Sequence, residues 1–199
     1  MIKSIIDSFS SLSNILWASQ ICGLIGFLFI GISYLFKKKV FLALATISFI
    51  FFILEQAFAS LYASIIVSSI CLIRNFLMFI FVLKKGKELP RSIIYLLILS
   101  MWVGEVIYMS ISSSFNVWDN YLPPLMVTMS TFTQNHKKEI VIKCGATIHE
   151  TGFLIYYLVY NLPLSIIRQL ILVLFALGGI VLLFVNKKNK KKEIVNNSI

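Results

Sequence analysis

Long apolar runs alternate with short polar or basic segments along the whole chain, and this alternation predicts helices that cross a membrane. About 20 helical residues, each rising about 1.5 Å, span the roughly 30 Å hydrocarbon core of a bilayer. The fifth run is the weakest, because it is short, opens with Pro123-Pro124 and carries several Ser and Thr residues. The sequence predicts an all-α membrane protein with seven spans, at residues 17–36, 40–59, 61–83, 92–111, 121–135, 140–160 and 163–186.

The composition agrees with this interpretation. Hydrophobic residues make up 59% of the 199 residues and charged residues only 13%, whereas soluble domains carry roughly a quarter charged residues. No nucleotide-binding loop, GxSxG elbow or HExxH motif occurs, so we expect neither an enzyme nor a cofactor or metal site. The net charge of +10 lies mostly in the connecting segments. It therefore predicts contact with a lipid bilayer and no nucleic-acid partner.

The position of the basic residues predicts the orientation of the chain. Lysine and arginine concentrate in cytoplasmic loops, and here they follow the first, third, fifth and seventh spans, while the loops near Ala59, Asn116 and Asn161 have none. Without the fifth span, Lys137 and Lys138 would lie outside. We therefore expect the amino terminus outside and the carboxyl terminus in the cytoplasm.

The seven spans divide as three, one and three. The second and sixth spans carry an acid, Glu55 and Glu150, and the third and seventh carry an arginine, Arg74 and Arg168. Such parallel repeats occur in SWEET-type transporters. This predicts two parallel three-helix bundles joined by a linker helix. The chain is divided into a lead (1–16), a first bundle (17–83), a connector with linker helix and outer loop (84–120), a second bundle (121–186) and a solvated, poorly ordered basic cytoplasmic tail (187–199).

Four stretches resemble a known family: WASQICGLIGFLFIGISYLFKKK, ASLYASIIVSSICLIRNFL, LPPLMVTMSTFTQNHKKEI and IHETGFLIYYLVY. They are similar to the YgjV family of bacterial inner-membrane proteins and, more distantly, to the PQ-loop and SWEET sugar transporters. The resemblance implies a location in the bacterial inner (plasma) membrane. The SWEET likeness implies facilitated movement of a small polar solute by alternating access. SWEET proteins place a hinge proline in the first helix of each repeat; Pro123 and Pro124 match it in the second repeat only.

The sixth span carries His149 and Glu150 at its middle, where ionisable groups are expensive and usually face other helices, water or a substrate. On a helix, Glu150 shares a polar stripe with Lys143. His149 falls on a neighbouring stripe of small residues, Gly145 and Gly152, which predicts close packing. We therefore assign Glu150 to the functional face and give His149 less weight.

The predicted solute site contains Glu150, Arg74, Asn75 and, with less weight, His149. Two alternatives remain open: Glu150 faces a water-filled cavity lined also by Asn75 and binds a solute or a proton, or it forms a structural ion pair with Arg74. The proline pair is either a gating hinge or a helix start. The sequence leaves open the solute, a homo-oligomeric state, and a non-transporting scaffold or sensor.

The acids of the outer half-helices have a simpler expectation. Glu55 and Glu105 lie about where Arg168 lies, and charged side chains near helix ends often extend to the headgroup water. We expect both acids to do so.

Overall fold

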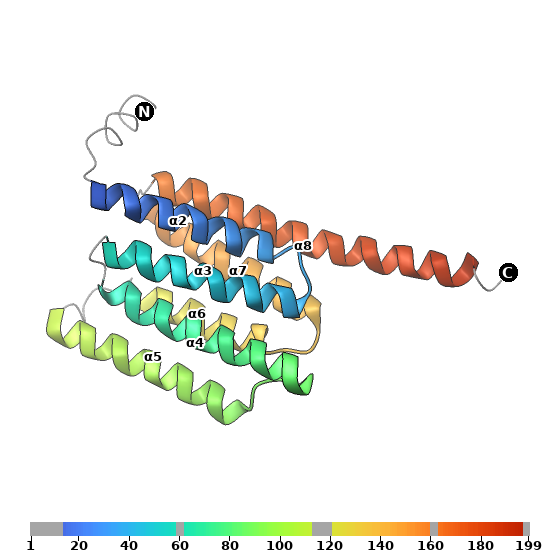
Figure 1. Ribbon diagram of the computed structural model, residues 1–199, viewed down its shortest axis with the longest axis horizontal. Coiled ribbons are helices and arrows are strands. Elements are labelled where there is room, and N and C mark those ends of the chain that lie inside the picture. The colour runs from blue at the N-terminus through green and yellow to red at the C-terminus, as the bar shows by residue number, and fades with distance from the viewer. Residues whose placement is uncertain (1–13, 59–61, 113–120, 160–162, 197–199) are drawn as a thin grey trace.

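The computed structural model describes residues 14–58, 62–112, 121–159 and 163–196, and this part of the chain forms seven helices and no strand. The all-α prediction is therefore confirmed for the described residues. The helices, shown in Figure 1, are α2 (Asn14–Ser33), α3 (Lys38–Phe58), α4 (Tyr62–Lys85), α5 (Arg91–Ser112), α6 (Leu122–Gln134), α7 (Glu139–Val159) and α8 (Pro163–Asn196).

Glycine and proline mark several helix boundaries. Gly86, directly after α4, has a φ of 58°, the left-handed conformation with which helices often end. Pro90 comes just before α5, and Pro163 opens α8. Pro123 and Pro124 lie in the first turn of α6, where a missing backbone N–H breaks no helical hydrogen bond. These residues explain why the apolar runs fold as separate helices.

Consecutive helices pack against one another, and α8 packs against α2, so the described helices form a closed circuit (Figure 1). Helix α4 also contacts α6 across it. Three turns share one end: Lys38 Nζ donates to the Asn135 and His136 carbonyls at 3.2 and 2.9 Å, and Leu89 N donates to Asn135 Oδ1 at 2.9 Å. We call this the basic end, formed by the α2–α3, α4–α5 and α6–α7 turns.

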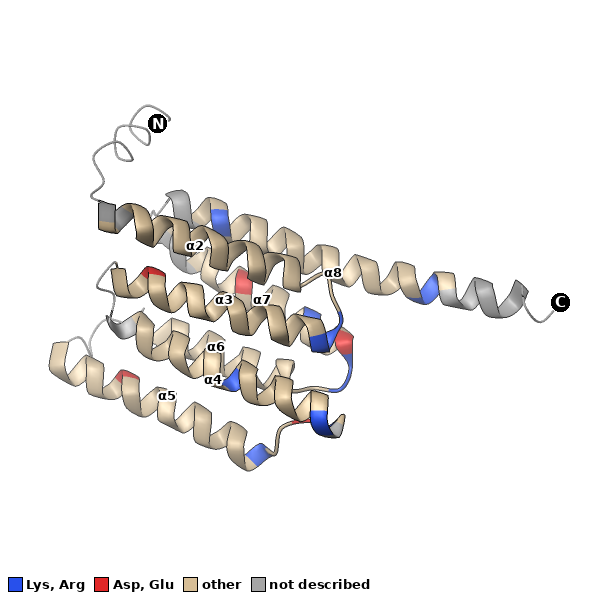
Figure 2. Cartoon of the chain, in the orientation of Figure 1, with Lys and Arg blue, Asp and Glu red and all other residues tan. Residues whose placement is uncertain are grey.

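Lysine and arginine gather at the basic end and on the part of α8 that extends beyond it (Figure 2). The opposite end of the bundle, where α3, α5 and α7 finish, is much poorer in positive charge among the described residues. The loops expected to lack lysine there, near Ala59, Asn116 and Asn161, lie outside the described residues. The basic residues that follow alternate spans in the sequence therefore lie at one end of the bundle.

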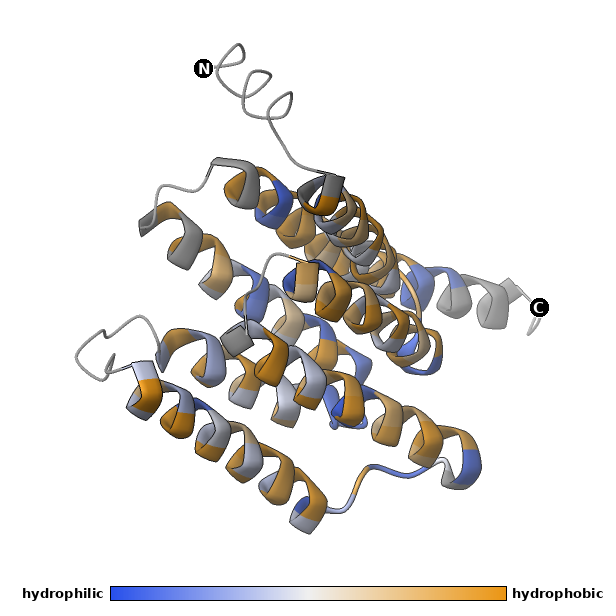
Figure 3. Cartoon of the chain, turned by 60° about the vertical axis from the view of Figure 1, so that its left-hand side comes forward, coloured by the Kyte–Doolittle hydropathy of each residue, from blue (hydrophilic) through white to orange (hydrophobic). Residues whose placement is uncertain are grey.

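Four helical segments are long and apolar enough to cross a membrane, judged by length and composition: Lys38–Phe58, Ser64–Lys84, Arg91–Ser112 and Ile166–Asn189. Their outer faces are apolar (Figure 3); Leu96 and Ile111 of α5, for example, are 64% and 81% exposed. Large contiguous apolar surfaces are rare on soluble monomers. The helices therefore support a membrane location.

Helix α6 corrects the expectation for the fifth span. It forms as a helix, but its 13 residues cover only about 20 Å, less than the thickness of the hydrocarbon. Its buried face is partly polar, with Ser130, Thr131 and Gln134. Helix α6 is thus a short polar helix inside the bundle, and it is not among the segments long enough to span alone.

Helix α8 corrects the expectation for the tail. The seventh span was expected to end near residue 186, with an irregular tail beyond it, but α8 continues to Asn196, a length of 34 residues. Lysine and glutamate are good helix formers, so the basic segment extends a helix that the apolar part has already nucleated. Residues 197–199, and residues 1–13 of the predicted lead (1–16), lie outside the described part.

Helix α8 passes very close to the end of α2 at Gly179. A Cβ atom built there would overlap the Tyr34 carbonyl oxygen, whereas one built at the neighbouring Gly178 would meet only Leu35 Cδ2, at 3.8 Å. The absence of a side chain at Gly179 therefore permits the α2–α8 contact that closes the circuit.

We expect Gly179→Ala to destabilise the protein by about 1–3 kcal/mol, the usual cost of overpacking. Gly178→Ala is the matched control; it should change stability by less than about 1 kcal/mol, because alanine favours the helix and finds room. Thermal unfolding of the detergent-purified variants measures both. Equal effects of the two substitutions would contradict the close approach at Gly179.

Candidate functional site

Glu150 lies at the centre of a buried polar cluster built from three parts of the chain. The residue is 4% exposed. Tyr34, directly after α2, donates its hydroxyl to Glu150 Oε1, and Gln169 of α8 donates its amide to Glu150 Oε2 and, at 2.9 Å, to the Glu150 carbonyl. Because hydrocarbon offers no hydrogen bonds, these donors are what make the carboxylate tolerable there. We call Glu150, Tyr34 and Gln169 the Glu150 cluster; it joins the end of α2 to α7 and α8.

His149 belongs to the same cluster, which corrects the assignment of the two residues to separate faces. Its Nδ1 lies 3.2 Å from Glu150 Oε1, and its ring lies 4.9 Å from that of Phe153. Adjacent residues point about 100° apart on a helix, but an imidazole is long enough to turn back toward its neighbour. The small-residue stripe itself packs as predicted, with Gly145 and Gly152 against Thr133 and Met126 of α6.

Arg74 and Asn75 lie in a second buried cluster, between α4 and α6. Arg74 is 2% exposed and Asn75 is completely buried. Arg74 Nε donates to Asn75 Oδ1 at 3.0 Å, and Nη1 donates to Ser130 Oγ at 3.1 Å and to Thr131 Oγ1 at 2.8 Å. The guanidinium is thus held by neutral oxygen atoms and is almost completely buried. We call these four residues the Arg74 cluster.

Of the two arrangements expected for Glu150, the ion pair with Arg74 does not form, since each residue has its own set of partners. Two small cavities between the helices, one beside Lys143 and one beside Arg74, are not lined by Glu150 or Asn75. An arginine and a glutamate at similar depth can point into different interhelical contacts, and sequence position alone does not distinguish these.

The outer acids differ from expectation in two ways. Glu55 of α3 forms an ion pair with Arg168 of α8, with Oε1 3.0 Å from Nη1, and Ser19 of α2 donates to the Glu55 carbonyl at 2.9 Å. Glu105 is 5% exposed and so does not reach headgroup water. It forms no ion pair within the described part of the chain. The expectation was wrong for Glu105, and Glu55 joins α3 to α8.

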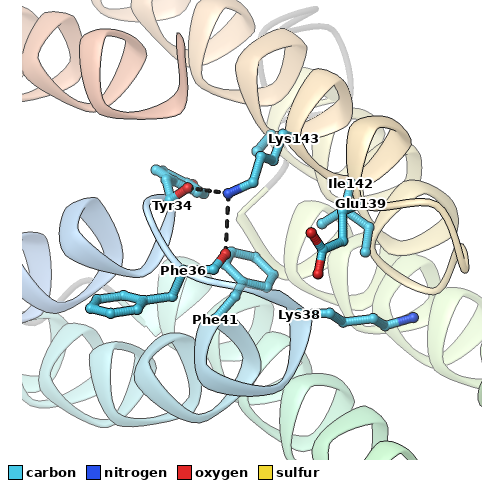
Figure 4. Close-up of a pocket in the computed structure, with 8 residues that line it drawn as sticks. Tyr34, Phe36, Lys38, Phe41, Glu139, Ile142 and Lys143 are labelled. Atoms are coloured by element: carbon cyan, nitrogen blue, oxygen red, sulfur yellow. Dashed lines mark hydrogen bonds between the residues drawn. The ribbon is translucent and has the colours of Figure 1, made fainter. Parts of the chain in front are cut away.

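Two lysines join the helices at the basic end in a reciprocal way. Lys143 of α7 donates to the Tyr34 carbonyl and, at 3.1 Å, to the Phe36 carbonyl, at the end of α2 (Figure 4). Lys38 of α3 donates to the carbonyls at the end of α6. A positive charge at a helix carboxyl end stabilises both the unpaired carbonyls and the helix dipole. Figure 4 shows Lys143 pointing at the α2–α3 turn, beside a cavity of about 10 Å³.

Sequence reasoning missed four members of these clusters. Tyr34 stands in an apolar run and resembles an ordinary interfacial aromatic residue, so nothing local marks its hydroxyl as a partner of Glu150. Gln169 does carry a signal, because a buried amide in an apolar span requires a hydrogen-bond partner. Ser130 and Thr131 were noticed only as polar residues that weakened the fifth span. Their function as ligands of Arg74 depends on the packing of α4 on α6.

Pro123 and Pro124 lie in the first turn of α6, and Pro124 is buried. They therefore start the short helix that carries Ser130 and Thr131. This position agrees with the expectation of a helix start.

No family model, no curated protein and no solved structure matches the sequence. The function is therefore inferred from the buried clusters, the charge distribution and the apolar surface of the protein.

We expect Tyr34→Phe to lower the stability by about 1.5–3 kcal/mol, because it removes a hydrogen bond to a buried carboxylate. The matched control is Tyr95→Phe; Tyr95 is 57% exposed and its ring packs edge-on against Phe132, a contact that phenylalanine keeps. Its effect should stay within about 0.5 kcal/mol. Thermal unfolding in detergent measures both, and an unchanged melting temperature for Tyr34→Phe would argue against the Glu150 cluster.

Proposed function

We propose that the protein is a bacterial inner-membrane facilitator that moves a small polar solute by alternating access. In this proposal α2–α4 and α6–α8 are two parallel triplets and α5 is the linker between them. The amino terminus lies outside and the carboxyl terminus lies in the cytoplasm. We also propose that the chain is related to the YgjV family and, more distantly, to the SWEET transporters, as the resemblance of its sequence implies.

One observation carries it: buried polar side chains from both triplets meet where the triplets meet. Tyr34 of the first triplet binds Glu150 of the second. Arg74 of the first binds Ser130 and Thr131 of the second. Polar groups inside a membrane are costly and commonly mark solute or ion pathways, and repeat-built transporters place their sites at the repeat interface. The proposed solute-binding residues are Glu150, Arg74, Asn75 and His149.

Contacts between the triplets at both ends of this interface support alternating access. At the basic end, Lys38 and Lys143 each bind the end of a helix from the other triplet. Toward the opposite end, Glu55 pairs with Arg168. A protein closed at both ends resembles the intermediate through which an alternating-access cycle passes, and each set of contacts can open while the other stays closed. Pro123 and Pro124 are the proposed hinge of the second triplet.

The reciprocal lysines also favour the parallel repeat. Each lies near the start of the middle helix of its triplet and binds the end of the first helix of the other triplet. A two-fold axis along the membrane normal would relate two such contacts. The proposed orientation follows from the basic end, because cytoplasmic surfaces are enriched in lysine and arginine.

Helix α8 favours a second candidate function, a non-transporting scaffold or sensor. Its basic part extends past the bundle as a helix (Figure 1) and exposes Lys187 and Lys188. A basic helix beside a membrane binds anionic lipid or an acidic protein surface. This function would not require the buried clusters to open.

Uptake of a panel of radiolabelled sugars, amino acids and organic acids into proteoliposomes tests the first proposal. We expect one class to enter down its gradient. Glu150→Gln should slow its entry by at least about tenfold. This factor corresponds to the free energy of roughly one charge-assisted hydrogen bond. Glu88→Gln, the same change in the connector between α4 and α5, should leave entry unchanged.

Size-exclusion chromatography must show that each variant is folded. If none of the solutes moves under any gradient although the wild-type protein is folded in the vesicles, the transport proposal fails and the scaffold remains. Unchanged uptake in folded Glu150→Gln would remove Glu150 from the pathway.

A further inference from the structure

Arg74 is a buried cation that no acid in the described part of the chain neutralises. It is 2% exposed, and the carboxylates that form ion pairs there bind His149 and Arg168 instead. Its hydrogen-bond partners are one amide oxygen and two hydroxyl oxygens. Those oxygens satisfy part of its hydrogen-bonding capacity and leave its full positive charge in place.

The guanidinium has donors to spare. Nε uses its one hydrogen on Asn75, and Nη1 uses both of its hydrogens on Ser130 and Thr131. Nη2, which carries two hydrogens, donates to none of the described residues. The Nδ2 amide group of Asn75, also fully buried, has no partner in the same part of the chain. The Arg74 cluster therefore has an excess of unpaired hydrogen-bond donors.

A cavity lies beside Arg74. It is situated between α4, α5 and α6, has a volume of about 10 Å³ and is lined by Arg74 and Thr131 together with Cys71 and apolar side chains that include Leu97, Ile98 and Met101. This is room for about one water-sized particle. One positively charged side chain facing a small, mostly apolar cavity is a geometry that favours an anion.

The neighbouring charged and titratable groups do not supply that anion. Glu105 is one helical turn from Met101 on α5 and is buried, but it forms no ion pair with Arg74. The Tyr34 hydroxyl donates a hydrogen bond to Glu150, and the Cys71 thiol is buried beside the cavity. A water molecule would accept from Nη2 without neutralising it. An uncompensated charge in a low-dielectric interior is costly, whereas a paired one is tolerated.

We propose that the cavity beside Arg74 binds one small monatomic anion such as chloride, with Nη2 as its main donor and the apolar walls limiting the size of the ion. The site lies between α4, α5 and α6, away from Glu150. It depends only on the burial and unpaired donors of Arg74, so it holds for a transporter and for a scaffold.

Equilibrium dialysis of radiolabelled chloride against the detergent-purified full chain tests the site, with gluconate as the bulk anion because it is too large for the cavity. We expect saturable binding of one chloride per chain, with weaker competition by the larger nitrate and formate ions. Arg74→Gln should weaken binding by at least about tenfold. Arg168→Gln is the matched control and should leave binding unchanged, because Arg168 pairs with Glu55.

A second pair of variants keeps the test valid if Arg74→Gln does not fold. Ile98→Phe should fill the cavity and abolish chloride binding while retaining Arg74. Leu99→Phe is the control, since Leu99 is 60% exposed on the outer face of α5. Absence of saturable binding to the wild-type protein would overturn the proposal. Unchanged binding in folded Arg74→Gln or Ile98→Phe would also overturn it.

Discussion

A hydrocarbon interior offers no hydrogen bonds, so each polar group that enters it must find its partner within the chain. Glu150 meets this constraint through Tyr34, directly after α2, and Gln169 of α8. The carboxylate thereby joins the end of α2 and the side of α8 to α7. The contact at Gly179, where α8 lacks a side chain beside Tyr34, permits the same arrangement.

The same constraint explains why the buried polar clusters lie between the helices and not on the outer faces of the bundle. On the outer face, Leu96 and Ile111 are exposed and apolar, and they need no hydrogen-bond partner. Inside, Arg74 takes its partners from α6, the helix whose hydroxyl side chains make it a poor span. The hydroxyl groups that lower the hydropathy of α6 are the same groups that accept hydrogen bonds from Arg74.

Much of the fold could be predicted from one sequence. Periodic apolar runs, a proline or glycine at several helix boundaries and the rhythm of the lysines indicated the number and order of the helices. The buried positions of Glu150, Arg74 and Asn75 also followed from their depth in apolar segments. The pairing of these residues did not follow. Depth is a one-dimensional property, and Arg74 and Glu150 share it without sharing an interhelical contact.

The sequence alone determined that this protein has an apolar exterior, helices of near-membrane length and ionisable groups in its interior, because these depend on composition and spacing within single helices. Only the tertiary structure decided that Tyr34 and Gln169 donate hydrogen bonds to Glu150 and that Glu55 forms an ion pair with Arg168. It also decided that Glu105 is buried and that α8 continues as a helix through its basic tail. Those outcomes depend on which helix faces meet. Side chains more than a hundred residues apart, such as Tyr34 and Glu150, acquire a partner only when the helices pack.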